Sequence, residues 1–299
     1  MEFQTPVLAP AAAEITLLTL TCVVLLVDAF LSQARRDVTY LLTLLTIVST
    51  AFVVAFMTGE GAEVTFSGHF VNDPMARVLK LVVLATTGMV FLYSRDYLAR
   101  ENIYRGEFFV LALFATLGMM VMISAHSLLS VYLGLELLSL SLYALVAFNR
   151  DSGNAAEAAM KYFVLGAIAS GCLLYGMSLL YGAAGTLDLA ELSARIADGE
   201  TLSDLWVLVG LAFLLVGIAF KFGAVPFHMW LPDVYQGTPT PVTLFVGSAP
   251  KVAAFAMAIR LLVDGLGSIG EAWQSMLIVL AVASMALGNI VAIAQTNIK

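Results

Sequence analysis

The chain has 299 residues, of which 61% are hydrophobic and 12% are charged, and its mean hydropathy is +0.96. Soluble domains carry about 25% charged residues, so the composition excludes a single soluble domain and predicts a polytopic membrane protein. The net charge is −7 and the 14 basic residues form no run, so we expect no nucleic-acid partner.

Apolar stretches long enough to cross a bilayer recur along the chain. A helical span needs about 20 apolar residues at a rise of about 1.5 Å each, so the sequence predicts an all-α fold with about nine transmembrane helices. The first apolar run lacks a basic leader and a cleavage site, so we expect a retained span rather than a secretory signal. The predicted spans are 12–31, 39–58, 74–93, 107–125, 127–148, 155–181, 205–222 with a broken continuation, 242–263 and 272–294.

Basic and acidic residues alternate between successive loops. The first, third and fifth loops carry arginines, among them Arg35, Arg95 and Arg150, whereas the loops between them are acidic. Because arginine-rich loops stay in the cytoplasm, the pattern predicts that the N-terminus lies outside and that Lys299 is cytoplasmic. In the acidic loop 182–204, leucines at helical spacing predict a short amphipathic helix on the outer side.

One apolar helix, around 205–238, is predicted to be discontinuous. Its apolar run reaches Lys221 and is followed by Gly223, Pro226 and Pro232. Proline inside a helix removes an amide donor and clashes with the preceding turn. Within a membrane, such broken backbone occurs only where it is buried in protein or lines a watery cavity. The alternative is a helix that ends at Gly223, with Lys221 reaching the membrane interface.

Four charged residues fall at predicted membrane depth, namely Glu136, Lys161, Lys221 and Lys251. Each costs about 2.5–3.5 kcal/mol at a helix centre, so we expect them to face one another or water. The structural alternatives are a protonated Glu136 that bonds a neighbouring helix and an interfacial Lys161. His228 is either a packing residue or, beside two buried lysines, a member of a proton relay.

These residue types suit proton movement rather than bond making. A buried lysine loses its proton readily, and an approaching carboxylate favours the protonated form again. The sequence contains no nucleophile–base pair, phosphate-binding loop, metal cluster, or haem or iron–sulfur spacing. Cys22 and Cys172 match no metal or redox spacing and are expected to be buried thiols.

Four runs resemble a known family: LGLELLSLSLYAL, AAMKYFVLGAIASG, FKFGAVPFHMWLPDVYQGTPTPVT and SAPKVAAF. They are similar to the antiporter-like membrane subunits of proton-pumping NADH–quinone oxidoreductase, the bacterial respiratory complex I, and of multi-subunit cation/proton antiporters. The tract PFHMWLPDVYQG resembles the subunit N branch of this family more than the L and M branches, which differ after the aspartate. The resemblance covers most of the chain from about Pro74 onward.

The resemblance implies two inverted five-helix repeats, each with one discontinuous helix. It implies that Glu136 and Lys221 form the coupling pair of the first repeat and that Lys251 is the central lysine that passes protons onward. Lys161 and His228 would be auxiliary members of the path.

The resemblance also predicts a division of the chain into three parts. Residues 1–106 would hold three leading helices, residues 107–264 the first repeat, and residues 265–299 the start of the second repeat. Because the family continues with further spans, including a second discontinuous helix, the sequence resembles a fragment of such a subunit that lacks most of the second repeat.

The resulting hypothesis is a proton-translocating membrane subunit of NADH:quinone oxidoreductase in the bacterial inner membrane. Such a chain is part of an enzyme but carries no redox centre and binds no cofactor. Quinone, NADH, FMN and iron–sulfur clusters are expected in other subunits. The expected partners are antiporter-like and small membrane subunits of the complex and the lipid bilayer. The alternatives are an Mrp-like cation/proton antiporter subunit and a membrane anchor whose buried charges only hold helices together.

Overall fold

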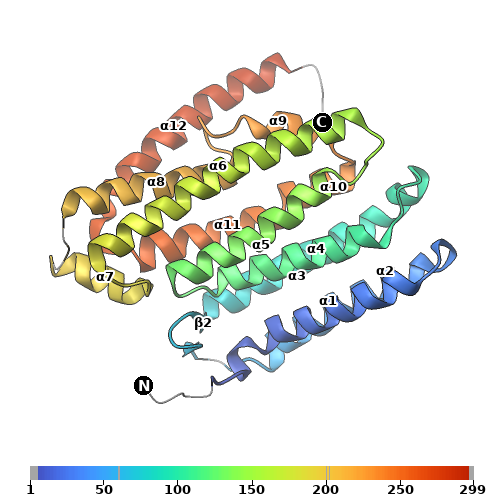
Figure 1. Cartoon of the computed structure of the whole chain (residues 1–299), viewed down its shortest axis with the longest axis horizontal. Coiled ribbons are helices and arrows are strands. Elements are labelled where there is room, and N and C mark those ends of the chain that lie inside the picture. The colour runs from blue at the N-terminus through green and yellow to red at the C-terminus, as the bar shows by residue number, and fades with distance from the viewer. Residues whose placement is uncertain (1–5, 60, 200, 202, 296–299) are drawn as a thin grey trace.

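Long helices make up most of the computed structural model, which describes residues 6–59, 61–199, 201 and 203–295. Within these residues, nine helices are long and apolar enough to cross a membrane. The prediction of an all-α polytopic membrane protein with about nine spans is therefore confirmed. Figure 1 shows the helices side by side, with α1 (Ala12–Phe30) and α2 (Arg36–Phe56) at one edge and α12 (Gly270–Ala294) at the opposite edge.

The spans between these edges follow one another with short connections. Three of them begin at an N-cap residue whose side chain accepts a hydrogen bond from a backbone amide of the first turn. First-turn amides have no acceptor within the helix, so the cap supplies one. The capping residues are Asp73, Ser127 and Ser152. The helices are α3 (Pro74–Arg100), α4 (Gly106–Ile123), α5 (Leu128–Val146), α6 (Gly153–Ala184) and α8 (Asp204–Phe222).

Helix α4 lies at the centre of the packing, and 78% of its apolar window is buried. It approaches α5 very closely through two glycines. A Cβ atom on Gly118 would lie 2.6 Å from the Leu138 amide nitrogen, and one on Gly134 would lie 2.7 Å from the Met122 amide nitrogen. Small residues at such crossings let helices pack backbone to backbone.

Short elements close one end of the bundle, the end where β2 and α7 lie in Figure 1. Strands β1 (Glu63–Thr65) and β2 (Phe70–Asn72) pair antiparallel, and Phe70 bridges Ala125 in the α4–α5 turn. The predicted amphipathic helix is present as α7 (Leu189–Ala197), which buries Leu189 and Leu192. The hairpin was not predicted, because strands of three residues leave no periodic pattern.

The eighth predicted span is present, but it is not one regular helix. It consists of α10 (Thr240–Gly247), α11 (Ala249–Ala258) and a π-helical segment η3 (Ile259–Asp264). Ser248 separates the first two with φ −116° and ψ −92°. Pro250 explains the interruption, because its ring cannot follow the turn that a continuous helix would place before it.

The two cysteines are not both buried. Cys22 is exposed on the surface of the bundle and Cys172 is half-buried, so the prediction of two buried thiols is wrong. Both lie in apolar helices, where a lipid-facing position satisfies the hydropathy as well as a buried one does. Lys299 lies outside the described residues.

Candidate functional site

The break after α8 is built by glycine and proline. Helix α8 ends at Phe222, and Gly223 adopts the left-handed conformation (φ 73°) that terminates many helices. A side chain at Gly223 would also collide with Leu231. Pro226 lies in the non-helical segment 224–229, and α9 then runs over Trp230–Gly237. Pro232 lies inside the first turn of α9 rather than in the break, since first-turn residues need no amide donor.

Glu136 and Lys221 lie on facing helices but do not form a direct ion pair among the described residues. The Ser170 hydroxyl of α6 donates to the half-buried Glu136 carboxylate. The Lys221 ammonium instead donates to the Ser139 hydroxyl at 2.7 Å. Ser139 follows Glu136 by one helical turn on α5, so the charge of Glu136 still acts on Lys221.

Lys251 reaches from α11 to the broken end of α8. Its ammonium donates to the carbonyl oxygens of Lys221 at 2.8 Å and Phe222 at 3.0 Å, and it lies 5.1 Å from the centre of the Trp230 ring. The last carbonyl groups of a helix have no partner within the helix. Lys251 therefore satisfies two of these acceptors, and its charge also acts on the Lys221 ammonium.

His228 lies in the non-helical segment between α8 and α9 and is half-buried. Its Nδ1 atom is buried and forms no hydrogen bond with any described residue. A buried ring nitrogen without a protein partner can form a hydrogen bond with a water molecule or take up a proton.

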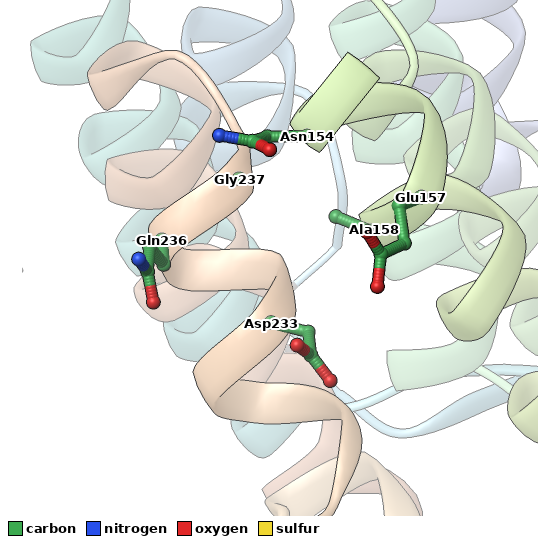
Figure 2. Close-up of a pocket in the computed structure, with 6 residues that line it drawn as sticks. All are labelled: Asn154, Glu157, Ala158, Asp233, Gln236 and Gly237. Atoms are coloured by element: carbon green, nitrogen blue, oxygen red, sulfur yellow. The ribbon is translucent and has the colours of Figure 1, made fainter.

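Lys161 lies at the protein surface, apart from the other lysines. Its ammonium pairs with Glu157 at 2.8 Å and with Asp233 at 3.0 Å, and its side chain is 42% exposed. The pair with Asp233 joins α6 to α9, whereas Glu157 lies one turn before Lys161 on α6. Beside them lies a cavity of about 190 Å³ lined by six residues, and Figure 2 shows the Glu157 and Asp233 carboxylates on the two helices that flank it. The position fits the interfacial alternative stated for Lys161.

Several further charged side chains are buried that were not predicted from the sequence. Lys80 on α3 is fully buried and pairs at 2.6 Å with Glu14 on α1, whose side chain is 8% exposed. Arg260 is also buried and pairs with Asp73 at 2.8 Å and Asp264 at 3.0 Å. A count of charges inside the predicted spans 12–31, 74–93 and 242–263 would have found Glu14, Lys80 and Arg260, so the set of four membrane charges was incomplete.

The Asp73 carboxylate lies just outside the membrane-spanning part of α3. Burial alone would raise its pKa, but hydrogen bonds from Arg260 and from the Ala76 amide, together with the charges of Arg260 and Lys80, hold the pKa below its ordinary value of 3.8. Asp73 is therefore a stable anion that joins the start of α3 to η3.

In the part of the chain that the structure describes, no group of three or more His, Cys, Asp or Glu side chains is arranged to hold a metal ion. What the geometry brings together is a line of proton-holding groups and hydroxyls at a helix break: Glu136 with Ser170, Lys221 with Ser139, and Lys251 at the end of α8. Such groups can hold and pass protons.

The matching protein family and the similar curated proteins both carry the name NADH:quinone oxidoreductase. The family described as NADH:quinone oxidoreductase/Mrp antiporter, TM, matches residues 125–299. NADH-quinone oxidoreductase subunit N of Thioalkalivibrio sulfidiphilus (strain HL-EbGR7) is 54% identical over 299 residues, covering 100% of this chain and 62% of the relative. The subunit N of Nitrosomonas europaea is 55% identical with the same coverage. The chain thus spans about three fifths of the length of these relatives.

Chains of two solved respiratory membrane complexes also match this chain. Respiratory complex I from Thermus thermophilus with bound aureothin contains a chain that matches with a TM-score of 0.78 and 33% identity, over 95% of this chain and 58% of that one. The membrane-bound sulfane sulfur reductase, an archaeal respiratory membrane complex, matches with a TM-score of 0.74 and 29% identity, over 91% and 57%. The resemblance to subunit N drawn from the sequence motifs is confirmed.

Proposed function

Because the chain belongs to the NADH:quinone oxidoreductase/Mrp antiporter family of membrane proteins, we propose that it moves protons across the bacterial inner membrane as part of subunit N of NADH–quinone oxidoreductase. The names of the relatives support this enzyme over an Mrp-like antiporter. NADH, FMN, iron–sulfur clusters and quinone belong to other subunits in this proposal. Antiporter-like and small membrane subunits of the complex are the neighbours.

One observation carries the proposal. Lys221 lies beside the helix break, donates to Ser139 next to Glu136, and has its own carbonyl oxygen bound by Lys251. Breaking a helix and enclosing two half-buried lysines is costly in a membrane, and a purely structural helix needs neither. A proton path needs both, since it requires groups that gain and lose protons and backbone that admits water.

The chemistry follows from the charges around Lys221. The Glu136 carboxylate favours the protonated lysine, whereas the nearby Lys251 ammonium disfavours it. If Glu136 is neutralised or moves away, burial and the repulsion by Lys251 both oppose the charged form, and Lys221 releases its proton. In a low-dielectric interior such interactions are strong, so a small displacement of α5 against α8 switches Lys221 between loaded and empty.

The remaining assignments follow from the same arrangement. Lys251 passes protons onward, His228 contributes its unpartnered Nδ1 beside the break, and Lys161 acts at the surface with Asp233. The three leading helices form a unit before the first repeat. The arginine-rich loops place the N-terminus outside and Lys299 in the cytoplasm.

The test is a Glu136→Gln substitution in the complete enzyme complex, with the number of protons moved per electron as the readout. We expect the complex to assemble and the ratio to fall, because glutamine keeps the shape but not the charge that holds a proton on Lys221. Glu271→Gln is the matched control, since Glu271 is an exposed carboxylate in the first turn of α12, outside the proposed path. An unchanged ratio in Glu136→Gln would refute the proposed pairing.

A further inference from the structure

Helices α2 and α3 leave an apolar groove on the surface of the bundle. The cavity measures about 580 Å³ and is lined by aliphatic and small residues, among them Leu44, Ile47 and Ala51 of α2 and Ala85, Gly88 and Leu92 of α3. The groove is open because Ala51, Ala85 and Gly88 carry little side chain. It is much larger than the gaps that ordinary helix packing leaves.

A polar cavity of about 370 Å³ lies between the same two helices, at the arginine-rich end. Its lining includes Arg36 and Asp37 at the start of α2, Arg95 and Asp96 near the end of α3, and Tyr104. The positive and negative charges are equal in number. Arg36 is already paired with Asp28 at 2.5 Å, and Arg95 is paired with Oδ1 of Asp37 at 3.0 Å. The groups open to a ligand are therefore Asp96, the second oxygen of Asp37 and the remaining donors of Arg95.

The two cavities follow one stripe on each helix. On α3, Gly88 and Leu92 of the apolar groove are followed by Arg95 and Ala99 of the polar cavity, at spacings of four, three and four residues. Such spacings place side chains on the same helix face. The Arg95 guanidinium also lies 5.4 Å from the centre of the Tyr40 ring on α2. The polar cavity and the apolar groove therefore follow one another along the same face of α3.

We propose that this combined groove binds one zwitterionic phospholipid, with its phosphate on Arg95, its ammonium on Asp37 and Asp96, and an acyl chain between α2 and α3. The length supports an acyl chain: from Leu81 to Leu92 the groove follows α3 for about 16 Å. That is close to half of the roughly 30 Å hydrocarbon core of a bilayer.

The charge distribution selects the headgroup. Arg95 uses its Nε and Nη2 groups on Asp37, at 3.3 Å and 3.0 Å, which leaves donors for a phosphate. Asp96 is exposed and forms no ion pair with any described residue. Tyr104 donates to Asp37, and burial together with this carboxylate raises the pKa of Tyr104 to about 12, so the hydroxyl stays a donor. An anionic headgroup would have no excess positive charge to meet.

The test uses the complete purified complex in nanodiscs made from equal amounts of palmitoyl-oleoyl phosphatidylethanolamine and phosphatidylglycerol, followed by native mass spectrometry of the lipids that stay bound. We expect the wild type to keep one more phosphatidylethanolamine than Gly88→Leu. A Cβ atom on Gly88 meets only Ile47, at 3.5 Å, so leucine fits and fills the groove. Thr86→Leu adds similar bulk at a half-buried position of α3 that does not line the groove, and it should keep the lipid.

A second variant tests the headgroup. Asp96→Asn removes one negative charge from the polar cavity, so the preference should shift toward phosphatidylglycerol by about twofold to fivefold, the range for exposed charge pairs. Equal retention of both lipids by the wild type would overturn the headgroup assignment. Loss of lipid from Thr86→Leu as from Gly88→Leu, or a helix of a partner subunit in the groove in a cryo-EM map of the complex, would overturn the site.

Discussion

The Lys251 ammonium donates to the carbonyl oxygen of Lys221 at 2.8 Å. The two lysines are thus connected through the backbone at the end of α8 rather than side chain to side chain. The position of Lys251 depends on the helix break, because only a terminated helix leaves that carbonyl free. A movement of the break would therefore change the surroundings of both ammonium groups together.

Lys251→Arg separates a fixed charge from an exchangeable proton. Arginine keeps the positive charge and can donate to the same carbonyl groups, but guanidinium does not release its proton in proteins. We expect the complex to assemble and the proton-to-electron ratio to fall about as far as in Lys251→Ala. Arg195→Lys is the control, because the Arg195 guanidinium pairs with Glu191 on α7, outside the proposed path, and it should pump normally. Normal pumping by Lys251→Arg would show that Lys251 acts only as a charge.

The buried pair of Glu14 and Lys80 predicts a strongly coupled double-mutant cycle. Lys80→Met leaves the Glu14 carboxylate buried without its partner, which costs about 3–5 kcal/mol of unfolding free energy. Glu14→Gln combined with Lys80→Met should recover most of that loss, because no charge then remains buried. Thermal unfolding of the purified complex, followed by the loss of this subunit, measures the effect. Additive single effects would contradict a direct 2.6 Å ion pair.

Asp73 predicts a pH-dependent contribution to stability. Its pKa is lower in the folded protein than its ordinary value of 3.8, so its contribution is present above that value and is lost as the pH falls through the lowered pKa. Asp73→Asn keeps a capping oxygen for α3 and removes the charge that faces Arg260. At pH 7 we expect a loss of about 1 kcal/mol, measured by thermal unfolding. A difference from wild type that persists undiminished well below pH 3.8 would refute the ionic origin.

Cysteine labelling tests the proposed orientation. In a background without Cys22 and Cys172, a cysteine at Ala194 on α7 should react with a membrane-impermeant maleimide added to intact cells. A cysteine at Ser32, before α2, should react only after the membrane is opened. Both positions are exposed, so burial cannot explain a difference. Reaction of Ser32→Cys in intact cells would reverse the orientation.

The sequence alone determined the spans and the first helix break. Membrane spanning depends on the apolar length of one segment, and a break depends on glycine and proline at one place, so both are properties of a local stretch of chain. The nine spans, the α7 helix and the end of α8 at Gly223 could be predicted for this reason. The break at Ser248 could also have been predicted from Pro250, but the span is apolar on both sides of the break, so its hydropathy indicated one continuous helix.

Only the tertiary structure decided which groups meet. Lys251 finds acceptors 29 and 30 residues earlier in the chain, Lys80 finds Glu14 on another helix, and Lys221 meets Ser139 rather than Glu136 itself. Lys161, expected in the same group, lies at the surface with Asp233. A hydropathy average combines a charged residue with its apolar neighbours along the chain. The partner of that charge depends instead on which helices pack together and on the depth at which the two side chains lie. Those partners arise from long-range packing, which the order of residues along the chain does not display.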